Sequence, residues 1–186
     1  MRLLAITPGD ERDLRPWLEA LGRVGLPAVL FREAAGTDLR PFVQIAADHI
    51  ETVIVHGRHP QAAHFVGAGH GLHLAAARIG LDSAPFFGTS CHDGSELDAA
   101  FSSGADYALL SPVWTPTSKP DDPRPSIGIQ SFRELAGKRQ VLALGGVNAE
   151  RHRAIRAAGG HGSAVCGDLF GRATPELAAE ALRAYS

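Results

Sequence analysis

The chain has 186 residues, of which 45% are hydrophobic and 20% charged, and its formal net charge at pH 7 is -2. This composition is that of an ordinary globular protein, and the charge excludes the basic surface that nucleic acid or an anionic membrane would require. The apolar run that begins at Leu3 is too short for a signal peptide, and no stretch reaches the roughly 18 to 20 residues of a membrane-spanning helix. We therefore expect a cytoplasmic protein with neither nucleic acid nor a membrane as a partner.

Short apolar runs rich in Val, Ile, Leu and Ala alternate with amphipathic stretches along the chain. Such alternation is typical of parallel strands joined by crossover helices. The apolar runs predict strands at residues 3–7, 27–32, 52–56, 71–74, 86–90, 107–111, 141–144 and 162–166.

The stretches between these strands predict helices at residues 13–24, 37–47, 60–66, 75–79, 93–102, 131–135, 148–158 and 174–185. In the first helix, Pro16 falls in the first turn, where proline is tolerated. The second helix is expected to begin with Thr37 or Asp38 as its N-cap. Regular alternation of this kind predicts the α/β class and a single (β/α)8 TIM barrel with parallel strands, one domain over residues 1–186.

A long loop at residues 111–128 interrupts this regular pattern and contains five prolines. It follows the sixth strand, on the face where barrel active sites are built. We interpret it as a substrate lid. Within it, Lys119 and Ser118 are candidates for binding a phosphate or pyrophosphate, and a solvated loop lysine is the alternative.

Glycines follow the last two predicted strands, as Gly145-Gly146 and as Gly167. Exposed backbone N–H groups at such loops favour a phosphate, and Asn148 is suited to cap the next helix. In barrels, the loops after strands 7 and 8 often form a phosphate site. The alternative is that these glycines only satisfy the geometry of their turns.

Polar residues cluster around the end of the fifth strand. Thr89 and Ser90 are candidate substrate contacts, and His92 is a candidate general acid or base, because histidine as a residue type suits proton transfer near neutrality. A structural or helix-capping role for His92 is the alternative. Cys91 would need a lowered pKa to act as a nucleophile, and its sequence surroundings supply none.

His56 and His73 lie on the third and fourth predicted strands and are candidate substrate contacts. Together with His92 they make zinc binding an alternative, but no familiar ligand spacing accompanies them, and we expect no metal. Cys91 and Cys166 also lack a metal-binding spacing, and we expect both to be reduced.

The order of several motifs resembles the thiamine phosphate synthase and TenI superfamily. These are GLHL from Gly71, SCHDGSE from Ser90, GADY, SPV, TSKP, LGGVN from Leu144, and AVCG ending at Gly167. The resemblance covers most of the chain and implies the same barrel. It also implies a phosphate site formed by the amides of Gly145, Gly146, Cys166 and Gly167.

The resemblance to the synthase branch is incomplete. A synthase joins a pyrimidine pyrophosphate to a thiazole phosphate, and acidic residues after strands 3 and 4 hold the magnesium that neutralises the pyrophosphate. Here those places hold His56-Gly57 and the alanines that begin at Ala75. Of the synthase pattern after strand 2, Arg32 and Glu33 remain, and Arg32 is a candidate substrate contact.

The other branch is the TenI-like thiazole tautomerase, which shifts a proton on a carboxythiazole phosphate and needs no metal. The Gly57-Arg58 pair resembles this branch. The family's acid/base histidine, however, corresponds to the position after strand 6, where this chain has Ser111-Pro112. Ser111 remains a candidate substrate contact, and His92 is the surviving candidate for the catalytic acid/base.

Three hypotheses follow. The first is a metal-independent tautomerase, an isomerase that uses His92. The second is a thiamine phosphate synthase, a transferase, and magnesium is expected only under this hypothesis. The third is a non-catalytic binder that keeps the scaffold. All three expect a phosphorylated thiazole as the ligand and no organic cofactor, and a homodimer stays open as the oligomeric state.

Overall fold

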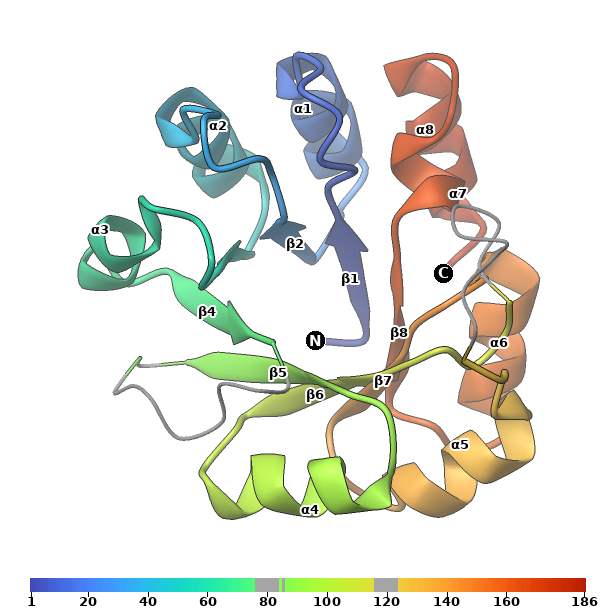
Figure 1. Cartoon of the computed structure of the whole chain (residues 1–186). Helices are drawn as coiled ribbons and strands as arrows, with labels where there is room; N and C mark the ends of the chain where they lie inside the picture. The colour runs from blue at the N-terminus through green and yellow to red at the C-terminus, as the bar shows by residue number, and fades with distance from the viewer. Residues whose placement is uncertain (76–83, 85, 116–123) are drawn as a thin grey trace.

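The computed structural model describes residues 1–75, 84, 86–115 and 124–186. Its eight strands form a closed barrel in which each strand pairs in parallel with its neighbours in the sequence, and β1 pairs with β8 (Figure 1). The strands are β1 (Leu3–Ile6), β2 (Ala28–Phe31), β3 (Thr52–His56), β4 (Gly71–Leu74), β5 (Phe87–Cys91), β6 (Tyr107–Leu110), β7 (Val141–Ala143) and β8 (Gly162–Val165). The predicted barrel is confirmed, and every predicted strand bound lies within one residue of the observed one.

The helices of the described residues form an outer ring around the strands (Figure 1). They are α1 (Arg15–Arg23), α2 (Arg40–His49), α3 (Ala62–Gly67), α4 (Gly94–Ser102), α5 (Gly128–Ala136), α6 (Ala149–Ala157), α7 (Gly167–Phe170) and α8 (Pro175–Arg183). The helix predicted at 75–79 falls outside the described residues except for Ala75, which is not helical. None of the helices in the described ranges is long and apolar enough to cross a membrane.

The helix caps agree with the sequence in some places and not in others. Asn148 caps α6 as predicted, because its side chain accepts a hydrogen bond from the backbone N–H of Arg151 at 2.9 Å. The prediction for α2 was wrong, since Leu39 is its N-cap and no side chain caps it. Asp38 instead accepts hydrogen bonds from the backbone N–H and the guanidinium of Arg40, so its carboxylate stabilises the turn that precedes the helix.

The core has two layers, because successive side chains of a strand point to opposite faces of the sheet. One face of the strands fills the barrel interior with a cluster formed by Leu4, Ile6, Ala28, Leu30, Ile54, Tyr107, Leu109, Leu142 and Ala164. The other face packs against the helices, as Val29, Val55 and Ala108 do. The same alternation decides which residues at the carboxyl ends of the strands face the open end of the barrel, here called the mouth.

Tyr107 is the largest side chain of the interior layer and is 1% exposed. Its ring lies over Gly88 of the neighbouring strand, where an added Cβ would lie 2.1 Å from the ring. Phe86 and His73 both stack with this ring, at centroid distances of 5.5 and 5.7 Å. The bare backbone at Gly88 therefore makes room for the tyrosine that supports the floor of the mouth.

Candidate functional site

Residues from neighbouring strands line the mouth. Side chains two positions apart on a strand lie on the same face. His73, Ser90 and Ser111 each come two positions after an interior-facing residue of β4, β5 or β6, so they face the mouth. On the other side of the barrel, Arg32, His56 and Cys166 continue the interior-facing positions of β2, β3 and β8. The backbone N–H of Arg32 donates to the buried Thr7 hydroxyl at 2.9 Å, which joins the ends of β1 and β2.

His73 lies at the floor of the mouth and is 1% exposed. Its Nδ1 is 2.9 Å from the Tyr107 hydroxyl, and its Nε2 is 2.9 Å from the Ser90 hydroxyl. Burial is the main cause that lowers the pKa of His73 to about 3, and His56 and Arg32 lower it further. The imidazole is therefore neutral at physiological pH.

His56 stands beside His73, with 5.8 Å between their ring centroids. Its Nδ1 accepts a hydrogen bond from the backbone N–H of Arg58 at 3.2 Å. Burial lowers the pKa of His56 to about 4, and the positive charges of Arg58 and Arg32 contribute. Both guanidinium groups are thus close enough to set the electrostatics of this side of the mouth.

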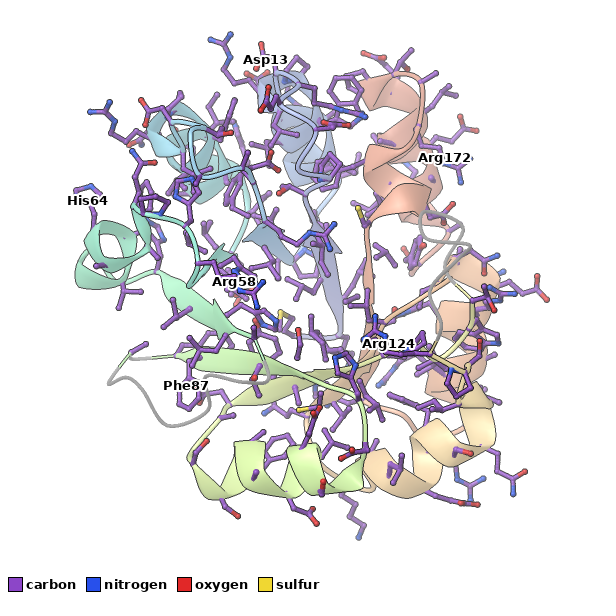
Figure 2. The ribbon with its side chains drawn as sticks, in the orientation of Figure 1. Asp13, Arg58, His64, Phe87, Arg124 and Arg172 are labelled. Atoms are coloured by element: carbon purple, nitrogen blue, oxygen red, sulfur yellow. The ribbon has the colours of Figure 1, made fainter. Side chains whose placement is uncertain are left out.

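Figure 2 shows where the charged side chains lie. Arg58 and Arg124 stand on either side of the central space of the barrel in this view, whereas Asp13, His64 and Arg172 lie at the periphery. The guanidinium of Arg58 therefore brings positive charge to this central space, which favours an anionic ligand.

His92 follows β5, and its ring reaches toward the loop after β6. Nδ1 lies 2.8 Å from the backbone carbonyl of Ser111, and Nη1 of Arg124 lies 2.8 Å from Nδ1 and 3.0 Å from Nε2. Guanidinium groups only donate, so Arg124 occupies the lone pair of the imidazole whichever nitrogen carries the proton. His92 can act as a base only after Arg124 moves away from the ring.

Glu96 does not interact with the His92 ring. Its carboxylate accepts the backbone N–H of His92 at 2.7 Å, and Asp93 accepts the backbone N–H of Glu96 at 2.9 Å. This exchange is close to a capping box at the start of α4. The spacing of the SCHDGSE motif is thereby explained by the helix that it begins, and the position of His92 follows from it.

The Gly145-Gly146 loop lies under the start of the β6–α5 loop. Both glycines have positive φ, at 97° and 61°. A Cβ on Gly145 would lie 2.9 Å from the carbonyl oxygen of Trp114, and one on Gly146 would lie 2.8 Å from that of Thr115. Glycine is therefore required at these two positions because the backbone of the β6–α5 loop packs closely against them.

Cys166 and Gly167 complete the end of β8. Cys166 is the N-cap of α7, and a Cβ added to Gly167 would meet nothing within 4 Å. Within this short helix, the backbone N–H groups of Leu169 and Phe170 donate to the carbonyl of Cys166 at 3.2 and 2.9 Å. Tyr185 and Arg172 bind the carboxylate of Asp168 at the same turn.

Several predicted site residues lie elsewhere. Thr89 is 1% exposed and has the opposite orientation to Ser90 on β5, so it packs away from the mouth. Cys91 also faces outward, and burial raises its pKa to about 12, which makes it a poor nucleophile. Ser118 and Lys119 lie outside the described residues.

Over the described ranges, no three His, Cys, Asp or Glu side chains come together as a group that could hold a metal ion. His56, His73 and His92 therefore do not form the alternative zinc site. Both cysteines are free. The sequence reasoning missed Tyr107, whose hydroxyl contacts His73, and Arg124, whose guanidinium contacts His92. The signal that could have found Tyr107 is Gly88, the glycine opposite to it on β5.

A family model described as thiamine monophosphate synthase matches residues 3–169. A thiamine-phosphate synthase of Thioalkalivibrio sulfidiphilus is 31% identical over 98% of this chain and 93% of its own length. One from Salinispora tropica is 34% identical over 77% of this chain and 72% of its own length.

Solved structures give the same fold. A thiamine phosphate pyrophosphorylase from Pyrococcus furiosus has a TM-score of 0.75 and 24% identity, covering 98% of this chain and 93% of its own. A structure described as native KDPGal reaches a TM-score of 0.74 at 19% identity, covering 100% of this chain and 92% of its own. At these identities the structural likeness shows the barrel fold alone.

Proposed function

Because the chain belongs to the thiamine monophosphate synthase family, we propose that it is a transferase that joins a pyrimidine pyrophosphate to a thiazole phosphate. The observation that carries this proposal is Pro112, at the position where the tautomerase branch has its acid/base histidine. The Cβ of Pro112 would lie 3.0 Å from a Cβ on Gly145, so the proline ring stands beside the β7 loop. The proline side chain at this position has no group that can transfer a proton.

The thiazole phosphate is proposed to bind at the ends of β7 and β8. Gly145, Gly146, Cys166 and Gly167 supply the backbone amides, as the resemblance implies. The open space around Gly167 supports this assignment.

The pyrophosphate is proposed to bind on the side of the mouth formed by β2 and β3. Arg32 and Arg58 bring positive charge there, as their effect on the pKa of His56 indicates. Negative charge develops on the pyrophosphate as its bond to the pyrimidine breaks, and a positioned guanidinium stabilises that charge.

Magnesium does not fit the described residues of this mouth. Gly57 and Ala75 follow β3 and β4 where the synthase branch has acidic residues, and neither has a side chain that can bind a hard cation. We therefore assign the neutralisation of the pyrophosphate to Arg32 and Arg58 and derive no step through a metal.

The test is turnover of the two substrates by the purified chain, with thiamine phosphate measured by chromatography. We expect product both with magnesium and with EDTA, and a rate about 10- to 100-fold lower in Arg58→Ala, because a bond to a charged group contributes about 1.5 to 3 kcal/mol. Arg133→Ala, on the outer helix α5, is the matched control. Product that requires magnesium would refute the role of the arginines, and no product under either condition would refute the transferase.

A second candidate is the tautomerase, in which His92 moves a proton on a carboxythiazole phosphate. The observation that favours it is the cationic side of the mouth, which suits a carboxylate as well as a pyrophosphate. With the exocyclic thiazole phosphate as the sole substrate, turnover that is lost in His92→Ala would support this candidate. Calorimetric binding of a thiazole phosphate without any turnover would instead indicate a binder.

A further inference from the structure

His73 joins two hydroxyl groups at the floor of the mouth, one buried and one open to the ligand. The Tyr107 hydroxyl lies 2.9 Å from Nδ1, and the Ser90 hydroxyl lies 2.9 Å from Nε2. Tyr107 is 1% exposed, while Ser90 is half-buried at the next-to-last position of β5. The three side chains therefore connect the barrel interior to the mouth.

The protonation states of this network follow from its burial. Burial raises the pKa of Tyr107 and lowers that of His73, so both groups are neutral. A neutral imidazole has one N–H donor and one acceptor nitrogen, and a tyrosine hydroxyl has a single hydrogen to donate. The direction of the Tyr107 O–H therefore determines which nitrogen of His73 carries its proton, and that proton in turn determines the direction of the Ser90 O–H.

Tyr107 decides between the two arrangements. Among the residues that the structure describes, its hydroxyl has His73 Nδ1 as its one hydrogen-bond partner. If Nδ1 carried the proton, the buried tyrosine O–H would have no acceptor, which is unfavourable. The O–H of Tyr107 therefore donates to Nδ1, and the imidazole proton lies on Nε2.

With the proton on Nε2, His73 donates to the Ser90 oxygen and has no lone pair left to remove the serine proton. The arrangement thus excludes an activated serine nucleophile, although a serine next to a histidine would suggest one. The O–H of Ser90 is directed away from His73. Arg32, whose charge acts on His73, brings an anion to the same place.

We propose that Tyr107 and His73 are positioning residues that fix Ser90 as a hydrogen-bond donor to a pyrophosphate oxygen of the ligand. The pyrophosphate rests on the proposed function, whereas the direction of the hydrogen bonds does not. In this chain of hydrogen bonds, the Tyr107 O–H donates to Nδ1 of His73, Nε2–H of His73 donates to the Ser90 oxygen, and the Ser90 O–H donates to the ligand.

Nitrogen-15 NMR of histidine-labelled protein tests the first half of the proposal. At pH 7 we expect His73 to be protonated on Nε2 alone in the wild type, and to show both tautomers in Tyr107→Phe. Phenylalanine keeps the ring that stacks with Phe86 and His73, and a thermal scan checks that the variant folds. A wild-type His73 that is protonated on Nδ1 would overturn the proposal.

Calorimetry with inorganic pyrophosphate tests the second half. We expect affinity about 10-fold lower in Ser90→Ala and about 3-fold lower in Tyr107→Phe. Because Tyr107 acts through Ser90, the double variant should bind no more weakly than Ser90→Ala alone. Ser90→Thr should keep most of the affinity.

Thr89→Val is the matched control, since its hydroxyl lies one position away and faces outward. Unchanged pyrophosphate affinity in Ser90→Ala, or additive losses in the double variant, would overturn the role of Ser90. So would a wild-type protein that does not bind pyrophosphate. If these results hold and the two substrates still give no product, the proposed transferase fails and the hydrogen-bond arrangement stands.

Discussion

Replacing Gly146 and Gly167 separately by alanine distinguishes a glycine required by the fold from one that leaves room for a ligand. Gly146 has a φ of 61°, a left-handed conformation that costs an alanine about 1 to 2 kcal/mol. Its added Cβ would lie 2.8 Å from the Thr115 carbonyl oxygen and 2.9 Å from Nη1 of Arg151. Forcing such contacts costs about 1 to 3 kcal/mol more, since the backbone oxygen cannot rotate away.

We therefore expect Gly146→Ala to lower the free energy of unfolding by about 2 to 5 kcal/mol, a large part of the 5 to 15 kcal/mol typical of a domain. Gly167→Ala should change it by less than about 1 kcal/mol, because a Cβ there meets nothing within 4 Å and alanine favours the helix.

Urea unfolding followed by circular dichroism measures both values. Binding of inorganic phosphate, measured by calorimetry below the unfolding transition, shows whether Gly167→Ala blocks the proposed site. A loss of phosphate affinity without a loss of stability would locate the anion over α7. The reasoning is refuted if Gly146→Ala is as stable as the wild type, or if Gly167→Ala is the more destabilised of the two.

Three further predictions concern the floor and rim of the mouth. Gly88→Ala should destabilise the protein by about 1 to 3 kcal/mol and alter the near-ultraviolet dichroism of Tyr107, since its Cβ would lie 2.1 Å from the ring. Lowering the pH from 7 to 4 should destabilise the fold. The pKa values of His56 and His73 are lowered to about 4 and 3, so the unfolded chain binds more protons below its ordinary histidine pKa of about 6.5. Urea unfolding at each pH checks this, and a flat profile between pH 6.5 and 4 would contradict it. Arg58→Ala should raise the pKa of His56 in an NMR titration while leaving it below its ordinary value, because burial is the larger cause.

The strands were predictable because most of them are short apolar runs that are buried on both faces, and such runs stand out against the polar loops around them. The caps were less predictable. Asn148 caps α6 as expected, but Asp38 binds Arg40 and Gln61 and leaves α2 uncapped. When a carboxylate has several possible donors, the bonds that form depend on which donors lie nearest in three dimensions. The spacing of residues along the sequence does not give those distances.

The mouth was predictable in part. Strand alternation separates Ser90 from Thr89, since it depends only on position along β5, and it places Thr89, which was also predicted as a substrate contact, away from the mouth. It does not show that Arg124, beyond the long loop, reaches the ring of His92, or that Glu96 binds the backbone of His92 in place of its ring. Both contacts depend on how separate segments meet.

The sequence by itself determined the closed barrel, the strand ends that face its mouth and the family, because these follow from local periodicity and from motifs in a fixed order. Only the tertiary structure decided what the special residues do. Gly145 and Gly146 accommodate the backbone of the β6 loop, and Gly88 accommodates Tyr107, 19 positions further along the chain. Tyr107 in turn determines which nitrogen of His73 carries the proton and, through it, the direction in which the Ser90 O–H donates. The physical reason is that a hydrogen bond between buried groups depends on distances of about 3 Å across strands, which packing alone establishes.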